Sequence, residues 1–469
     1  MGLIAVNELN ELSVSIPLLS EPPTAEAFDR MLAAHVPPGI QQLIQLIAQD
    51  ADALQLPIYL VGGFVRDLLL GRPSLDLDFT VDGSAPDLAA LLEADLGGQI
   101  TVHPPFLTAT WTPGEEQHAA MDLPQVDGEP LTVDLVTARR EIYAHSGALP
   151  TVKPGALADD LFRRDFTLNA LAIQLLDYHW VDLHGGFSDL RDGLLRVLHP
   201  RSFQDDPTRI TRGARFSCRF GFQFAPETAA LIATASPSIA TVSGDRWRAE
   251  LLRIFAEPDP AACLNVLDQF AVLTQIVPGV SFIENDRLYP IVQDLQKALL
   301  ADRRVSGFES ASFIEAIWTV LSWGSTARTA LTDRLKLPPD ILIRLKAVER
   351  GLALLVDQPM PAPSVFVHAL EPIDLSGCAA LWAILPLAQR PLIERYIREW
   401  RVRQPIATGA DLRARGLQPG PAFGMLLKQL RDAWLDGAID SPQAEQVLLA
   451  QLIEALPETS TSHRAKSHT

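Results

Sequence analysis

The sequence predicts an α+β fold in which a mixed-sheet head is followed by an all-helical remainder. In the first third of the chain, apolar runs punctuated by Gly and Pro are typical of strands, at residues 58–61, 77–81 and 131–136. Residues 155–260 turn helical and rich in Arg, and residues 261–456 show Leu- and Ala-rich helices separated by turns. A chain of 469 residues is too long for one core, so we expect several domains in series.

The composition narrows the classes of function. A hydrophobic fraction of 48% without a long apolar run predicts no membrane span. The three cysteines lie far apart and the N-terminus lacks a secretory signal, which favours a cytoplasmic setting and no structural zinc. A net charge of −18 argues against nonspecific coating of nucleic acid, because such binding depends on Lys and Arg. Any contact with RNA is therefore expected to be local.

The two ends of the chain differ from the regions between them. Residues 1–37 carry Pro and acidic residues without sustained periodicity, which predicts an extension. Residues 457–469 have too little apolar content to pack and are predicted to be disordered. After the extension, apolar residues at helical spacing predict a supporting helix: Ile40, Leu43, Ile44, Ile47 and Leu54.

A glycine turn comes directly after the first predicted strand. Gly62 and Gly63 are succeeded by a short helix that contains Arg66 and Asp67. Glycines permit close approach and the N-terminal end of a helix is electropositive, so the turn could hold a triphosphate. A Gly-Gly pair alone is also typical of an ordinary turn. The choice between these two interpretations therefore depends on the acidic residues downstream.

Paired carboxylates open the next predicted strand. Apolar and acidic residues alternate there, which places Asp76 and Asp78 on one face. The two carboxylates repel each other unless a cation lies between them. Nucleotidyl transfer uses two metal ions roughly 3.5 to 4 Å apart, so a third acid is expected. Asp134, flanked by apolar residues of the strand at 131–136, is the candidate; the alternative is an acid that faces solvent on an edge strand.

A stripe of arginines comes after a second acidic pair. Asp205 and Asp206 precede Pro207, a helix-start signal that makes an N-cap the competing interpretation of Asp206. With little acid nearby, the stripe is expected to need an anion such as a triphosphate or an RNA backbone. Its members recur three or four residues apart and share a face: Arg209, Arg212, Arg215 and Arg219.

Asp206 and Arg209 could also select a base. A carboxylate that accepts beside a guanidinium that donates matches the pairing edges of cytosine and adenine and clashes with guanine and uracil. A mismatch leaves buried polar groups unsatisfied, at a cost on the order of 1 to 3 kcal/mol each. The pair thus offers selection of C and A without a nucleic-acid template.

These residues resemble the class II tRNA nucleotidyltransferases, or CCA-adding enzymes, together with bacterial poly(A) polymerases. The motifs include LVGGFVRDLLLGRPSLDLDFTVDG, VDLVTARREIY, RRDFTLNALAI and QDDPTRITRGARF. They extend over roughly residues 57–255 in the family's order. The resemblance implies a nucleotidyltransferase that acts on the 3′ end of tRNA with CTP and ATP as substrates.

The resemblance also implies roles for individual residues. Asp76 and Asp78 would hold Mg²⁺ and, with Asp134, form the catalytic set. Asn169 would contact or support the sugar. The remaining nucleotide-binding positions are Gly62, Gly63, Arg66, Arg164, Asp206, Arg209, Arg212 and Arg215.

The family's architecture implies domain bounds for this chain. Residues 411–437 resemble the family's tail segment, which favours tRNA over unstructured RNA. The oligomeric state stays open. The expected parts are an extension (1–37), a catalytic head (38–200), a helical neck with the nucleotide-reading helix (201–260), a body (261–360), a tRNA-binding tail (361–456) and a disordered C-terminus (457–469).

Several activities remain possible within the resemblance. Residues 139–160 keep the length and Gly-Ala-Leu-Pro core of the flexible loop that the family uses to switch from C to A addition, although the usual Pro-Gly is Ser146-Gly147. Full CCA addition is therefore placed first, before A-adding or CC-adding enzymes and poly(A) polymerase. A catalytically silent RNA-binding scaffold is the alternative outside the family. Two departures, Asp205-Asp206 for Glu-Asp and Asp245-Arg246-Trp247 for Glu-Arg-Ile, remove no charge.

Overall fold

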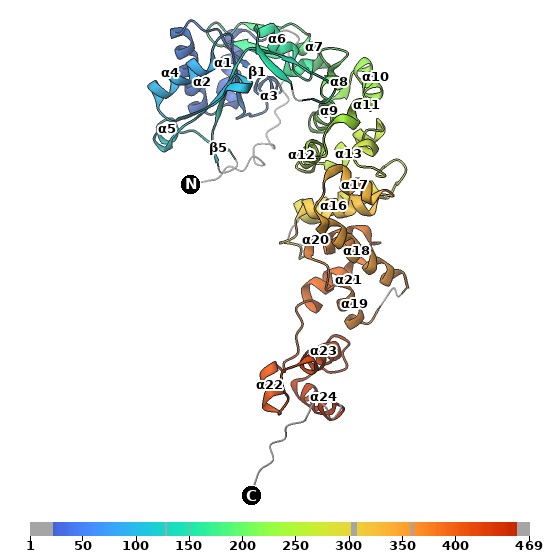
Figure 1. Ribbon diagram of the computed structural model, residues 1–469. Helices are drawn as coiled ribbons and strands as arrows, with labels where there is room; N and C mark the ends of the chain where they lie inside the picture. Colours follow the sequence, from blue (N-terminus) through green and yellow to red (C-terminus); the bar gives the residue numbers. More distant parts are fainter. Residues whose placement is uncertain (1–21, 127–128, 149, 302–306, 358–360, 457–469) are drawn as a thin grey trace. The chain divides into compact units, whose positions relative to one another are not determined.

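The computed structural model describes residues 22–126, 129–148, 150–301, 307–357 and 361–456. Figure 1 follows the order of the elements along the chain. The chain forms two compact units: Met1–Pro258 with Ala262–Ile276, and Asp259–Ala261 with Val277–Thr469. The disorder predicted for residues 457–469 lies outside the described residues. Among the helices described, none has the length and apolar character needed to cross a bilayer.

A seven-stranded mixed sheet organises the first unit. Its strand order is β11-β10-β1-β2-β7-β4-β3, with β2 and β7 parallel in the middle. β1 and β2 confirm the strands predicted at 58–61 and 77–81, and β7 lies within two residues of the predicted 131–136. The strands are β1 Ile58–Val61, β2 Leu77–Val81, β3 Gln99–His103, β4 Thr108–Thr112, β7 Val133–Thr137, β10 Leu171–Gln174 and β11 Trp180–Asp182.

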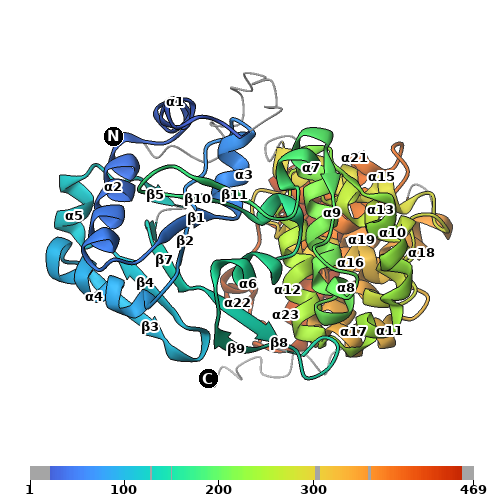
Figure 2. The same cartoon turned by 90° about the horizontal axis from the view of Figure 1, so that it is seen from above.

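The two faces of this sheet differ in chemistry. One face is apolar, with Phe79, Leu135 and Trp111 fully buried, and α4 packs against it over β3, β4 and β7. In Figure 2, α2 and α4 lie on the same side of the sheet. The opposite face carries Asp78 and Asp134, because side chains alternate along a strand. The helices of this part are α1 Ala25–His35, α2 Pro38–Ala53, α3 Gly63–Leu69, α4 Ala85–Leu96, α5 Glu115–Ala120, α6 Leu157–Phe162 and α7 Gly186–Asp192.

The helix predicted after the extension is confirmed as α2. Its face packs inward through Ile40, Leu43 and Ile47, each fully buried. Helix α1, by contrast, lies within the segment expected to be an extension. Phe28 of α1 is fully buried and contacts the rings of Tyr178 and Trp180, 5.0 and 5.6 Å away between centroids. The apolar periodicity of α1 is too brief to stand out in the sequence, and contacts with distant residues stabilise it.

The expectation that the chain is helical from residue 155 to 260 is wrong in part. β10 and β11 lie in this region and join the sheet beside β1. A short apolar run such as Leu171–Ile173 cannot be assigned to strand or helix by periodicity alone, and pairing with β1 decides it. The helices further along are α8 Ser202–Asp205, α9 Thr208–Phe220, α10 Pro226–Thr234, α11 Ser236–Thr241, α12 Gly244–Phe255, α13 Pro260–Gln269 and α14 Leu273–Ile276.

Short two-stranded pairs complete the first unit. Among them, β8 and β9 form a hairpin directly after β7, and residues 143–148 and 150 are the described part of the turn between them. These pairs are β5 Gln125–Val126 with β6 Glu129–Pro130, β8 Arg139–Ile142 with β9 Thr151–Pro154, and β12 Leu194–Leu195 with β13 Gln223–Phe224.

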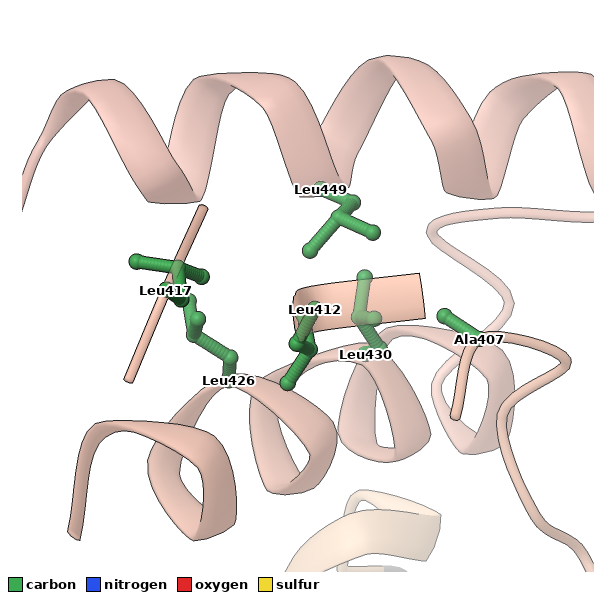
Figure 3. Close-up of a cluster of buried hydrophobic side chains, with 6 residues drawn as sticks. All are labelled: Ala407, Leu412, Leu417, Leu426, Leu430 and Leu449. Atoms are coloured by element: carbon green, nitrogen blue, oxygen red, sulfur yellow. The ribbon is translucent and has the colours of Figure 1, made fainter. Parts of the chain in front are cut away.

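The second unit is helical throughout its described elements. Its last three helices enclose a leucine cluster, in which Leu412, Leu426, Leu430 and Leu449 are fully buried and point toward one another (Figure 3). The buried Glu445 accepts backbone hydrogen bonds from Ile406 and Ala407, which fixes the chain entering this cluster. The helices are α15 Leu288–Gln296, α16 Phe313–Trp323, α17 Arg328–Leu335, α18 Pro339–Asp357, α19 Pro363–Leu370, α20 Leu375–Ile384, α21 Arg390–Arg395, α22 Gly409–Ala414, α23 Pro421–Leu435 and α24 Pro442–Glu454.

Candidate active site

The glycine turn brings two arginines and two carboxylates together. Gly62 adopts a positive φ of 71° between β1 and α3, a conformation that favours glycine. A β-carbon at Gly62 would lie 2.8 Å from Nη1 of Arg164 and 3.7 Å from Oδ2 of Asp78. One at Gly63 would lie 3.6 Å from Nη2 of Arg66 and 3.8 Å from Oδ2 of Asp76. The absence of a side chain at Gly62 lets the Arg164 guanidinium approach the turn closely, beside the Asp78 carboxylate.

Two carboxylates lie on one face of the central strands, and a third lies just before them. Asp78 on β2 is the direct cross-strand neighbour of Asp134 on β7, and Asp76 precedes Asp78 by two residues. Burial, and then the adjacent Asp76 carboxylate, raises the pKa of Asp78 to about 6. Burial and the Asp134 carboxylate likewise raise the pKa of Asp76. The cluster therefore carries more negative charge than its arginines offset.

Asp134 does not lie on an edge strand, so that part of the alternative is wrong, although its side chain is exposed. Its strand, β7, is hydrogen-bonded on both sides, to β2 and to β4. The carboxylate is exposed and accepts a 2.7 Å hydrogen bond from the hydroxyl of Thr110 on β4. The Asp134 carboxylate is thus exposed on the sheet face that it shares with Thr110 of β4.

This donor set fits a divalent cation. Oxygen ligands are those that Mg²⁺ prefers, and Asp76 and Asp78 supply carboxylates whose mutual repulsion a cation would relieve. Across the described residues, no three His, Cys, Asp or Glu side chains are already gathered to hold a metal. Asp76 and Asp78 are therefore the two residues that would hold it, while Asp134 is held by Thr110.

Arg164 is anchored on a buried acid. Its Nη2 donates to Asp160 at 3.0 Å, and Arg163 pairs with the same carboxylate at 2.8 Å. Burial alone would raise the pKa of Asp160, but Arg164 and Arg163 hold it below its ordinary value. The Nε of Arg164 is buried and has no hydrogen-bond partner within the described part of the chain. This arginine is therefore positioned at Gly62 with a donor to spare for an anion.

A buried polar network joins Arg66 to the arginine helix α9. Arg66 donates to the side-chain oxygen of Asn169 at 2.7 Å, and Asn169 donates to Asp165 at 2.8 Å. Asp165 also accepts from Arg212 at 3.0 Å. Burial would raise the pKa of Asp165, but Arg212 and the hydrogen bond from Asn169 hold it low. Asp165 therefore fixes residues from both the glycine-turn helix and α9.

The expectation that little acid lies near the arginine stripe is wrong. Arg215 and Arg219 both pair with the buried Glu257, at 2.7 and 2.6 Å. Arg209 is 4% exposed and donates to Ser202 and to the carbonyl of Arg163. The acid, Glu257, follows α12 and lies 42 residues from Arg215 along the chain, so local spacing could not reveal it. Two acids, Asp165 and Glu257, therefore pair with three arginines of the stripe, while Arg209 donates to neutral groups.

Asp206 has the geometry of a helix cap and a further partner. Its Oδ1 accepts from the amide of Thr208 at 3.2 Å, as the N-cap interpretation predicted. The same oxygen pairs with Arg246 of α12 at 2.9 Å, and Arg246 also donates to the carbonyl of Gly147 at 2.8 Å. The turn between β8 and β9 is thus tied to the start of α9.

Comparison with known proteins decides the family. Two family models match: the Poly A polymerase head domain over residues 58–196, and the probable RNA and SrmB-binding site of polymerase A over residues 221–283. The chain is 33% identical over 413 residues to the A-adding tRNA nucleotidyltransferase of Halalkalibacterium halodurans, covering 86% of this chain and 90% of that protein. The chain belongs to the tRNA nucleotidyltransferase family. The resemblance predicted from the motifs is confirmed.

Other members of this family show comparable similarity. The CC-adding tRNA nucleotidyltransferase of Deinococcus radiodurans is 32% identical over 434 residues, covering 90% of this chain and 99% of that protein. The Thermotoga maritima CCA-adding enzyme complexed with tRNA matches with a TM-score of 0.75 at 28% identity, covering 91% and 98%. Complexes of a CCA-adding enzyme with ATP and with CTP also match with TM-scores of 0.75, at 27% and 26% identity, covering 91% and 93% of this chain and 98% of each matched chain. The predicted fold class is confirmed.

Four residues of the site received no role from sequence reasoning. Asp160, Asp165 and Arg246 lie inside the family motifs. For Asp160 and Asp165, the signal in the sequence that could have indicated a role was an acid close to arginines; for Arg246, it was a basic residue at the start of a helix. Thr110 lies in an alternating strand, β4, that was not predicted. Its link to Asp134 depends on the register of two strands and has no local signature.

The raised pKa of Asp78 predicts how stability depends on pH. The folded carboxyl keeps its proton up to about pH 6, whereas an unfolded Asp loses it near pH 3.9. This stabilising contribution is therefore present below pH 3.9 and lost as the pH rises through about 6. In buffer free of divalent ions at pH 7.5, Asp78→Asn should raise the Tm by about 2 °C, measured by calorimetry.

The matched control is Asp52→Asn, which changes an exposed acid of α2 and should leave the Tm unchanged. Added Mg²⁺ should stabilise the wild type more than Asp78→Asn. A lower Tm for Asp78→Asn at pH 7.5 would show that the charge of Asp78 is already balanced within the protein.

Proposed function

We propose that this chain is a template-independent enzyme that adds C, C and A to the 3′ end of tRNA from CTP and ATP, releasing pyrophosphate. The observation that carries this proposal is the contact between the β8–β9 turn and the start of α9. The amide of Gly147 donates to the carbonyl of Asp205, and Arg246 bridges Gly147 and Asp206. Because the β8–β9 turn contacts the segment that carries Asp206, a movement of this turn can change which base Asp206 binds. Leu149, within the loop's Gly-Ala-Leu-Pro core, lies outside the described residues.

The residues of the head divide the work of binding the nucleotide. Arg164 and the amides of the Gly62–Gly63 turn bind the triphosphate, and Arg66, oriented by Asn169, lies beside them. Asp76 and Asp78 hold Mg²⁺, which when bound lowers the pKa of the attacking hydroxyl and neutralises the leaving pyrophosphate. The catalytic set is completed by Asp134.

Base choice is assigned to the start of α9. Asp206 would supply the acceptor and Arg209 the donor, which matches the pairing edges of C and A. To reach a base, Arg209 must give up a hydrogen bond to Ser202 or to the carbonyl of Arg163. Arg246 competes for the same Asp206 oxygen, so its position sets how much of the carboxylate is available to a base. Arg212 and Arg215 are held by Asp165 and Glu257 and complete the nucleotide-binding side.

Addition of A alone is the second candidate. The A-adding relative is 33% identical and the CC-adding relative 32% identical, each matched over nearly its full length. Identity therefore does not choose between partial activities. The retained length of residues 139–160 favours full addition over addition of CC alone.

The rest of the chain is assigned to tRNA. We propose the division into an extension (1–37), head (38–200), neck (201–260), body (261–360) and tail (361–456), with tRNA bound along the tail. The leucine cluster of α22, α23 and α24 gives this last part a core of its own.

One assay separates the candidate activities. Purified protein and Mg²⁺ are incubated with tRNA transcripts that end before CCA, after C and after CC, with CTP and ATP supplied separately and together. Full CCA addition predicts growth of the first transcript by three nucleotides. Extension of the CC-ended transcript alone would identify an A-adding enzyme, and arrest after CC a CC-adding one. A long A tail would identify a poly(A) polymerase, and no incorporation would favour a silent scaffold.

Substitution of Asp206 tests the base-reading role. Asp206→Ala should reduce the preference for CTP and ATP over GTP and UTP by about tenfold or more, because one acceptor is lost from the pairing edge. The measurement is kcat/KM for each nucleotide. The matched control, Asp205→Ala, removes the neighbouring acid, which forms an ion pair with the exposed Arg201 at 3.4 Å, and should keep the preference. Unchanged discrimination in Asp206→Ala would mean that Asp206 is only a helix cap.

A further inference from the structure

The face that carries the carboxylates continues across β4, where its side chains are partly exposed, to β3, where they are exposed. Thr110 is the register partner of Asp134, and Thr101 is the partner of Thr110, so the three side chains share a face. Thr101 is exposed and Thr110 partly exposed. The neighbouring register pairs on this face are Thr112 with Gln99 and Thr108 with His103. We call these six β3 and β4 residues the polar platform.

The covering of the sheet differs on its two sides. On the β1 and β10 side, the carboxylate face is closed by α6, whose Leu161 is fully buried against Val61 and Ala172. The reverse face of β4 is closed by α4, with Ala109 and Trp111 fully buried. The polar platform, by contrast, keeps its β3 side chains exposed. It is therefore an accessible surface that begins at the reactive acids.

The chemistry of the polar platform suits RNA. Hydroxyl, amide and imidazole groups both donate and accept hydrogen bonds, so they can contact ribose hydroxyls and phosphate oxygens. The six residues include no carboxylate, in contrast to a chain whose net charge is −18. The Thr110 hydroxyl connects this surface to the site by its 2.7 Å hydrogen bond to Asp134.

The direction of attack favours the same surface. In phosphoryl transfer the attacking and leaving oxygens lie roughly in line on opposite sides of phosphorus. The groups that can hold the triphosphate, Arg164 and Gly62, lie on the β1 side of Asp78. The attacking hydroxyl must then approach from the β7 side, where Asp134, β4 and β3 come in order.

We propose that the polar platform seats the 3′-terminal nucleotides of the acceptor RNA, and that Thr110 is a positioning residue that orients Asp134 toward the reacting hydroxyl. This inference rests on the proposed nucleotidyl transfer. Strand β3 is also a sheet edge, which could instead pair with an edge of a second copy of the chain. RNA is favoured over a second copy of the chain because the polar face of β3 and β4, and not the β3 edge, is continuous with the face that carries Asp134 and Asp78.

A charge placed on either face of β3 provides the test. Thr101→Glu puts a carboxylate on the polar platform, and the matched Val102→Glu puts one on the opposite face, at a residue that is 44% exposed. With a tRNA transcript that the wild type extends, Thr101→Glu should raise the KM for RNA by about tenfold by repelling phosphates and leave the KM for ATP or CTP within about twofold. Val102→Glu should change neither. Equal KM values for RNA in the two variants would overturn the proposal.

The role of Thr110 is tested by near-isosteric substitutions. Thr110→Val should lower kcat by about tenfold with little change in the KM for the nucleotide, because Asp134 loses its orienting donor. Thr110→Ser restores a hydroxyl and should recover most of that loss. A Thr110→Ser variant as slow as Thr110→Val would refute the positioning role.

Cross-linking and light scattering distinguish RNA from a second copy of the chain as the occupant of the polar platform. A photoreactive 4-thiouridine at the 3′ end of the transcript should cross-link to residues within 99–112, and a cross-link elsewhere would overturn the proposal even if the variants fold poorly. A change in oligomeric state of Thr101→Glu, seen by light scattering, would replace RNA with a second copy as the occupant. If the wild type transfers no nucleotide to any transcript, the proposed function itself fails.

Discussion

The repulsion among Asp76, Asp78 and Asp134 is the constraint on which the rest of the site depends. Two adjacent strands hold Asp78 and Asp134 on one face, Asp76 directly precedes the first of these strands, and burial and Asp76 raise the pKa of Asp78 to about 6. The mutual repulsion of these carboxylates favours the binding of a cation among them. The parallel pairing of β2 and β7 in the middle of the sheet keeps the carboxylates close together. Neither strand can rotate its acids to the other face without exposing its apolar side chains to solvent.

The arginines around the site differ from the acids, because they are paired with groups of opposite charge. Most of them are satisfied within the protein: Asp160 holds Arg163 and Arg164, Asp165 holds Arg212, and Glu257 holds Arg215 and Arg219. Removing one partner of such a buried pair leaves an uncompensated charge, which is strongly destabilising. These ion pairs therefore fix donors in position before a ligand arrives. The site combines acids that repel one another with arginines that are already held in position. This arrangement suits a polyanion that carries a metal ion.

The sequence predicted the features that local pattern encodes. Strands β1 and β2 and helix α3 with its glycine turn are all consequences of alternation and turn chemistry. Strands β10 and β11 were missed because their short apolar runs gain strand character only by pairing with β1. The carboxylate partners of the arginine stripe were missed for the same reason, since Glu257 lies far from Arg215 along the chain. Register and long-range ion pairs are properties of the folded chain.

The central claim is that the acid cluster performs the transfer, and Asp76→Ala tests it most directly. We expect this variant to lose incorporation of nucleotide into tRNA by at least about a hundredfold, because the cation loses a ligand, while its Kd for tRNA stays near that of the wild type. The exposed Asp82→Ala, just after β2, is the matched control and should retain transfer. Transfer at the wild-type rate by Asp76→Ala would contradict the assignment of the active site.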